Sequence, residues 1–312
     1  MVTMRRLFSL VLAICLSPAQ AADDDGWRTE LARFRLARRE SIAGPDGWAT
    51  LVARAPLANG TVTVGRSDAG IVLDTPNAPA LLGTLTVDGG ALRFEAAPSV
   101  DVRLSGRPVT TTTLSDDAAG AATVLEVGSL KAHVIKRKDQ RFLRVKDREH
   151  PARQRFDTLS WFEPAPAWRV RGTFEAADAG VFIEVTNVLG QVEPQPVRGT
   201  VAFRLDGGTQ RLVALDGTDG GLFLIFKDAT AGRSTYGAGR FLDTPAPAAD
   251  GRVEVDFNRA VNPPCAFTAF ATCPLPPRAN VLKVAIEAGE RAPAGGHPES
   301  TEVPCESAAA RP

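Results

Sequence analysis

Apolar and polar positions alternate in short runs along much of the chain. Between residues 51 and 137, runs of four or five residues are separated by Asp-Gly, Gly-Gly and proline turns. A period of two residues is typical of strands with one buried face, and this regular spacing predicts a β-sandwich. The predicted strands are 61–64, 70–73, 84–87, 91–94, 100–104, 124–127 and 132–135.

The same pattern resumes after residue 156. The segment Leu222-Phe-Leu-Ile-Phe226 is apolar throughout, which predicts a strand buried on both faces. About eight strands with few helices favour an antiparallel barrel or sandwich. The predicted strands are 169–174, 181–186, 200–205, 211–215, 222–226, 235–242, 253–257 and 282–287.

One segment near the N-terminus has a helical period instead. Trp27, Leu31 and Phe34 share one face of residues 27–40, among Arg and Glu residues. Apolar residues three or four apart form one side of a helix, and Gly44-Pro45-Asp46-Gly47 would end it. We therefore expect a helix here that packs across a β-domain.

Residues 1–21 have the composition of an export signal. A basic start is followed by the apolar run Leu7 to Leu16, and Ala19-Gln20-Ala21 has the small residues of a cleavage site. The apolar run is shorter than the roughly 20 residues of a membrane-spanning helix. We expect cleavage after Ala21, a periplasmic or secreted protein, and no transmembrane segment in the mature chain. An uncleaved anchor is the alternative.

These patterns divide the chain into successive parts. They are a signal peptide (1–21), a helical segment (22–48), a β-sandwich (49–140), a linker (141–158), a C-terminal β domain (159–290) and a disordered tail (291–312). The tail is assigned by its lack of apolar residues.

The overall charge is balanced, with 36 Lys and Arg residues against 36 Asp and Glu. A balanced chain has no net field to attract nucleic acid or an anionic membrane, so we expect no nucleic-acid partner. One local exception is the basic run 136–155, which Phe142, Leu143 and Val145 interrupt as a strand would. We interpret it as a solvated hairpin face followed by the linker.

Two cysteines flank a proline-rich loop near the end of the C-terminal domain. In an exported protein, Cys265 and Cys273 are expected to form a disulfide, worth roughly 2.5 kcal/mol for a loop of this size. Cys305 lies in the predicted tail. A zinc site or a Cys-His nucleophile is the alternative, but none of the three histidines is near this loop in sequence. We expect no metal and no cofactor.

Polar side chains are dense in the same region: Tyr236, Arg240, Asp256, Asn258 and Asn262. Asp256 and Asn258 share a face of a strand, and an arginine beside them would bind a carboxylate, phosphate or sugar through its forked N–H groups. The alternative is a structural interpretation, in which these residues stabilise the fold and bind no ligand. In it Arg240 pairs with Asp256, and the asparagines cap the Pro-Pro loop.

Three motifs follow one another in the first domain: Val64-Gly65-Arg66-Ser67, Ser105-Gly106-Arg107-Pro108-Val109 and Leu125-Glu126-Val127-Gly128-Ser129-Leu130. In this order they resemble the motifs of a forkhead-associated domain. The resemblance implies a β-sandwich that reads phosphothreonine through a Ser-x-x-His pair and an Asn-Gly. Ala78-Pro79-Ala80-Leu81 and Ser105 stand at those places, so we expect the architecture without the phosphate chemistry.

Five further motifs are spread over both domains: Asp46-Gly47-Trp48 through Gly65, 147–153, Ser160-Trp161-Phe162, 235–242 and 256–265. Together they resemble an uncharacterised bacterial and archaeal family, domain of unknown function 1684. Ala53-Arg54-Ala55-Pro56 and Val261 depart from the family pattern. The resemblance implies a common fold and a common site, and no established activity.

The sequence thus predicts a mainly β protein: an N-terminal helix, a forkhead-associated-like sandwich and an antiparallel β-barrel or sandwich. We expect a binding or interaction protein for a small molecule or a protein. Its site would lie near the Cys265–Cys273 loop and use Tyr236, Arg240, Asp256, Asn258 and Asn262. The alternative is a hydrolase at the same place. The chain has no phosphate-binding P-loop, Gly-x-Ser-x-Gly or His-Glu-x-x-His motif.

Overall fold

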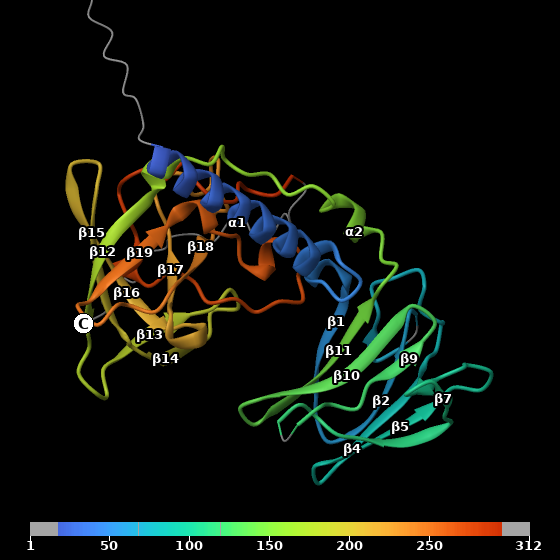
Figure 1. Ribbon diagram of the computed structural model, residues 1–312. Helices are drawn as coiled ribbons and strands as arrows, with labels where there is room; N and C mark the ends of the chain where they lie inside the picture. Colours follow the sequence, from blue (N-terminus) through green and yellow to red (C-terminus); the bar gives the residue numbers. More distant parts are fainter. Residues whose placement is uncertain (1–17, 68, 119, 295–312) are drawn as a thin grey trace, which may run out of the picture.

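Two β domains and a long N-terminal helix make up the structure, a computed structural model that describes residues 18–67, 69–118 and 120–294. Helix α1 (Pro18–Ala43) runs along the C-terminal domain and leads into the first β domain (Figure 1). The expected fold class, mainly β with a helix first, is confirmed. The predicted leader up to residue 17, and the tail from residue 295 with Cys305, lie outside the described residues.

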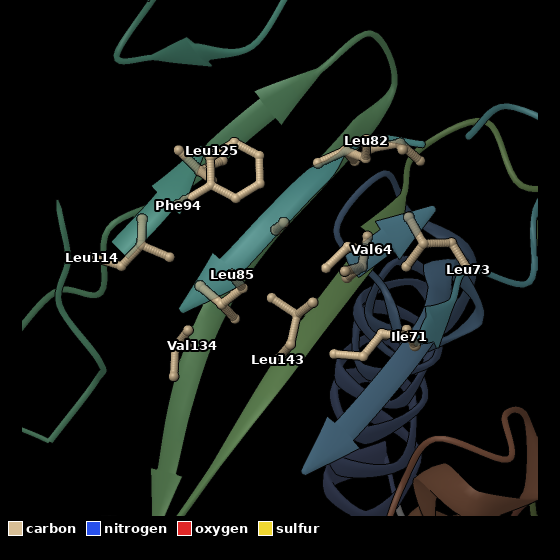
Figure 2. Packing of buried hydrophobic residues seen from close by; sticks show 14 of the residues in the cluster. Val64, Ile71, Leu73, Leu82, Leu85, Phe94, Leu114, Leu125, Val134 and Leu143 are labelled. Carbon is tan, nitrogen blue, oxygen red and sulfur yellow. The ribbon is translucent and has the colours of Figure 1, made fainter. Parts of the chain in front are cut away.

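The first β domain is a sandwich of two sheets, in the orders β1-β11-β10-β9-β6-β7 and β3-β2-β4-β5-β8. Its elements are η1 (Trp48–Thr50), β1 (Leu51–Leu57), β2 (Gly60–Gly65), β3 (Ile71–Val72), β4 (Gly83–Asp88), β5 (Ala91–Ala96), β6 (Arg103–Leu104), β7 (Arg107–Pro108), β8 (Thr111–Leu114), β9 (Leu125–Val127), β10 (Leu130–Arg137) and β11 (Gln140–Asp147). Alternate apolar residues of both sheets meet in one core, where Leu85, Val134 and Leu143 face one another (Figure 2).

The linker predicted at 141–158 begins later than expected. Residues 141–147 belong to β11, which lies between β1 and β10. Leu143 and Val145 face the sandwich core, while Phe142 and Arg144 project from the other side of the sheet. The short helix α2 (Ala152–Arg155) follows in the connection to the second domain.

The C-terminal domain is built on one sheet, in the order β18-β17-β16-β15-β12-β19, beside a two-stranded hairpin of β13 and β14. Its elements are η2 (Pro166–Trp168), β12 (Arg169–Ala176), β13 (Phe182–Thr186), β14 (Val192–Pro196), β15 (Gly199–Leu205), β16 (Gly208–Asp216), η3 (Thr218–Gly220), β17 (Leu222–Phe226), β18 (Arg240–Thr244), β19 (Arg252–Asp256), η4 (Phe257–Arg259), η5 (Pro264–Ala266) and η6 (Arg278–Asn280). As predicted, β17 is flanked on both sides and is almost wholly buried.

Two predicted strands of this domain differ in the structure. The strand expected at 235–242 starts only at Arg240, because Tyr236–Gly239 forms a turn in which Gly239 has φ +99°. Residues 282–287 form no strand. Their backbone bonds Lys227 and Ala229 instead, while Leu282 and Ile286 fill the domain core.

Helix α1 is longer than the predicted 27–40 and packs as expected on a β domain. Its buried side includes Trp27 and Leu31. The Trp27 indole N–H donates to the Asp256 carboxylate at 2.8 Å, and Arg38 reaches Glu290 at 3.2 Å. These contacts fix the helix against the C-terminal domain.

Candidate functional site

Arg240, the central residue of the predicted site, lies inside the C-terminal domain with 1% of its surface exposed. Its guanidinium donates to the Asp228 carboxylate at 2.7 Å, to the Ile286 carbonyl at 3.0 Å and to the Ala288 carbonyl. It also lies 5.2 Å from the centre of the Phe226 ring. Burial lowers the pKa of Arg240, and the Asp228 charge opposes that shift. Arg240 therefore fixes the irregular segment 286–288 in place.

Asp256 and Asn258 are also engaged inside the protein. Asp256 accepts the Trp27 N–H and, at 2.8 Å, the Asn258 side-chain amide. Asn258 bonds both the N–H and the C=O of Ala165 at 3.0 Å. The structural interpretation predicted an ion pair between Arg240 and Asp256, and this prediction is wrong. The Arg240 guanidinium binds the Asp228 carboxylate instead, and Asp256 binds helix α1. Asp256 and Asn258 attach α1 and the interdomain connection to the sheet.

Asn262 belongs to a third buried group. Its amide donates to Glu290 at 3.1 Å and to the Arg291 carbonyl at 2.8 Å, and Arg38 donates to the Asn262 carbonyl at 2.6 Å. Burial raises the pKa of Glu290, and Arg38 and Asn262 oppose the rise. The expected capping of the Pro-Pro loop by Asn262 is therefore replaced by a link between the loop and the end of the described chain.

Cys265 and Cys273 are both free thiols in the structure, so the predicted disulfide is not present. The Cys265 backbone N–H donates to the Cys273 sulfur at 3.2 Å, and the Tyr236 hydroxyl lies 3.8 Å from the Cys265 sulfur. A hydrogen bond between the thiols lowers the pKa of Cys265, while the same bond and burial raise the pKa of Cys273. The pair lies in an apolar cluster with Ile42 and Phe267.

A large cleft lies beside this cluster, between the two β domains. Its volume is about 1180 Å³. The outer face of β1, β10 and β11 forms one wall. The hairpin β13–β14, strands β17 and β18 and the loop around Cys273 form the other. Of the predicted site residues, only Cys273 lines the cleft.

The wall from the first domain is basic and aromatic. Arg54 of β1 and Arg144 of β11 are directly opposite each other in the strand register. The Arg54 guanidinium lies 4.0 Å from the Phe142 ring centre, and that of Arg144 lies 5.4 Å from the Trp48 ring centre. The facing wall is largely apolar and includes Ile225.

One ion pair connects the two walls. Lys138, in the turn between β10 and β11, lies 2.8 Å from Glu193 of β14, and both residues line the cleft. Figure 1 places this turn beside the β13–β14 hairpin. The pair is exposed, so we expect it to add little to stability.

The basic wall was not recognised from the sequence. The run 136–155 was interpreted as a solvated face, although Phe142 and Arg144 alternate with the core residues Leu143 and Val145. This alternation is the one sequence feature that indicates a strand whose second face is also partly buried. Arg54 is about ninety residues away, and its position in the sequence does not indicate that it joins this face.

The described part of the chain holds neither a metal-ligand cluster nor a helix suited to span a membrane. No three His, Cys, Asp or Glu side chains lie there in an arrangement that would hold a metal ion. No helix among the described residues is long and apolar enough to cross a membrane.

Comparison with known proteins supports the resemblance noted for the C-terminal half. Residues 154–291 match the model of the family described as "Protein of unknown function (DUF1684)". The solution NMR structure of an uncharacterized protein from Haloarcula marismortui is 33% identical over 45% of this chain and 78% of that chain, with a TM-score of 0.38. No curated protein matches. The motifs at 46–65 and 147–153 precede the matched residues, and the forkhead-associated resemblance is not confirmed.

Proposed function

Residues 154–291 make this chain a member of the family of unknown function DUF1684, and from the geometry of its cleft we propose that it is an exported binding protein for a small molecule. The supporting observation is the cleft of about 1180 Å³ between the β domains. Binding sites for small molecules are concave, mostly apolar and about 300–1,000 Å³ in volume. A cleft somewhat above that range accommodates a ligand that touches both domains.

The cleft lies near the cysteine loop, as the predicted site does, but most of the residues that line it are different. The loop that contains Cys273 and Pro274 forms part of the cleft wall. Arg240, Asp256, Asn258 and Asn262 do not line the cleft, and their contacts hold segment 286–288, helix α1 and the end of the described chain on the C-terminal domain. We therefore assign them to the scaffold of the C-terminal domain.

Binding is favoured over the alternative of hydrolysis. Acid–base hydrolysis requires two carboxyl groups with separated pKa values facing the substrate. Three acids of the described chain line the cleft: Glu193 pairs with Lys138, Asp216 lies 3.6 Å from Arg198, and Asp139 is exposed in the turn after β10. The cleft thiol, Cys273, has a raised pKa, which disfavours the nucleophilic thiolate.

Export and the disulfide are part of the proposal. The basic and apolar start of the chain and the small residues before Ala21 support export. In an oxidising compartment, the adjacent thiols of Cys265 and Cys273 support a disulfide beneath the cleft. The first β domain would act as a wall of the site. Its forkhead-associated resemblance implies a scaffold without phosphothreonine recognition.

Binding is tested by titrating the mature protein with N-phenyl-1-naphthylamine, a neutral apolar fluorophore. Val192 of β14 lines the cleft and is 54% exposed, whereas Val72 of β3 is 58% exposed and lies outside it. Val192→Asp is expected to raise the Kd about tenfold, as removal of roughly 1.5 kcal/mol of apolar burial does. Val72→Asp is the matched control and should leave the Kd unchanged.

Two results would contradict the proposal. One is the absence of saturable binding to the wild-type protein. The other is an equal effect of the two valine substitutions, since the fluorophore would then be bound elsewhere on the surface.

A further inference from the structure

The cleft contains two arginines whose positive charges are adjacent and uncompensated. Arg54 and Arg144 are cross-strand neighbours on β1 and β11, and like charges directly opposite each other destabilise a sheet. His133 of β10 continues the same row. Burial and the Arg144 charge lower the pKa of His133, so the histidine favours its neutral form beside the arginines.

No carboxylate of the described chain forms an ion pair with either arginine. The acid that acts on Arg144 electrostatically is Asp117, which is already bound to Arg137 at 2.8 Å. The Nε of Arg144 is buried without a hydrogen-bond partner among the described residues. Burial lowers the pKa of both Arg54 and Arg144, which reflects the cost of placing these charges in the wall.

Aromatic rings orient the two guanidinium groups. Phe142 lies beneath Arg54 at 4.0 Å, and Trp48 lies beside Arg144 at 5.4 Å. A guanidinium that rests on an aromatic ring keeps its N–H edge available for a forked pair with an oxyanion. Such forked pairs are the usual way in which arginine recognises carboxylate and phosphate groups.

The other charged side chains of the cleft either have a partner of opposite charge or are exposed to solvent. Lys138 and Glu193 neutralise each other across the cleft, and Asp216 lies near Arg198. Asp139 is exposed in the turn after β10. The wall that faces the arginines is largely apolar, and its apolar side chains include Val185, Leu189, Phe223, Ile225 and Phe241.

From this arrangement we infer that the cleft binds an amphiphilic anion: its carboxylate, phosphate or sulfonate group pairs with Arg54 and Arg144, and its apolar body lies against Ile225 and Phe241. The inference rests on the proposed function and specifies its ligand. The anion supplies the charge that no side chain of the described protein supplies to the arginine pair.

Two probes with the same ring skeleton test the inference. 8-Anilinonaphthalene-1-sulfonate carries the anion, and N-phenyl-1-naphthylamine lacks it. Arg54→Gln and Arg144→Gln are each expected to raise the Kd of the sulfonate about tenfold and to change that of the neutral probe less than twofold. Arg93→Gln is the control, since Arg93 is exposed on β5 outside the cleft and should affect neither probe.

A second measurement does not depend on the variants folding. In wild-type protein, 1 M sodium chloride should weaken sulfonate binding several-fold and leave neutral-probe binding unchanged or stronger, because salt screens charge and not apolar contact. Displacement by decanoate and by decyl phosphate, with decanol as the neutral control, distinguishes a carboxylate from a phosphate ligand. Stronger displacement by either anion than by decanol is expected.

The outcomes separate the inference from the proposed function. If the neutral probe binds and the sulfonate depends neither on the arginines nor on salt, the anionic ligand is refuted and the binding cleft stands. If neither probe binds the folded wild-type protein, both fail. Equal displacement by decanol and the two anions would also overturn the inference.

Discussion

The burial of Arg240 leads to a quantitative prediction about the C-terminal domain. Replacing Arg240 with Met removes the guanidinium but preserves much of the side-chain volume. The Asp228 carboxylate, 5% exposed, then loses its only cation among the described residues, and the carbonyls of Ile286 and Ala288 lose a donor. Breaking a buried ion pair from one side costs about 3–5 kcal/mol, so we expect the free energy of unfolding to fall by about 4 kcal/mol.

Two further substitutions distinguish the effect of the Arg240 charge from that of its guanidinium geometry. In the Arg240→Met background, Asp228→Asn should recover part of the loss, because it removes the uncompensated buried charge. Arg240→Lys keeps the charge but not the fork, and a single ammonium does not reproduce the fixed geometry that reaches Asp228 and two carbonyls. We expect it to be intermediate in stability.

The assay is urea unfolding together with hydrogen exchange, since a chain of two domains need not unfold in one step. Faster exchange should be confined to β17, β18 and their neighbours in the C-terminal domain. Binding of N-phenyl-1-naphthylamine at temperatures where the variant is folded should be unchanged, because Arg240 does not line the cleft. A loss of stability below about 1 kcal/mol, or loss of ligand binding in a fully folded variant, would refute this reasoning and return Arg240 to the binding site.

Two further predictions concern Asp147 and the cysteine pair. Burial alone would raise the pKa of Asp147, but hydrogen bonds from Ser129, Thr75, Asn77 and the Glu149 N–H hold it below its usual value. Its contribution to stability is thus present above the unfolded-state pKa of about 3.9 and is lost as the pH falls through the folded-state value. The difference in unfolding free energy between wild type and Asp147→Asn should shrink on acidification, and a difference that grows would contradict the assignment. In protein prepared with reduced thiols, oxidation with diamide, which takes up the two thiol hydrogens, should join Cys265 to Cys273. It should raise the unfolding free energy by up to roughly 2.5 kcal/mol, as followed by peptide mass mapping and urea unfolding. Cys273→Ser should show neither change, and an intermolecular product alone would count against the pair.

The sequence predicted those strands whose burial follows from their own residues, either by alternation or by a continuous apolar run. Leu222–Phe226 is an example, because a continuous apolar run leaves no polar face for solvent and so predicts burial on both faces. It missed β8 (Thr111–Leu114), which has one apolar residue and is held by pairing with β5. It also missed β14, whose two prolines argue against a strand although its pairing with β13 tolerates them at an edge.

The proposed site was harder to predict than the fold because its residues come from distant strands. Arg54 and Arg144 become neighbours only through the pairing of β1 with β11, and no local pattern encodes that register. The partner of Arg240 was missed for a related reason. Asp228 lies in a turn after β17, and the chain returns Arg240 beside it only through the pairing of β17 with β18.

The density of polar side chains in the C-terminal domain has a structural cause. After β19 the chain has no further named strand among the described residues, yet buried backbone groups still require partners. Side chains provide them: Asn258 bonds Ala165, Asn280 bonds Val213 and Ile225, and Arg240 bonds residues 286 and 288. A segment rich in Arg, Asp and Asn therefore marks irregular backbone held in a core. The better indicator of a ligand in this protein is the opposite condition, the pair Arg54 and Arg144, whose charges the described chain leaves without a counterion.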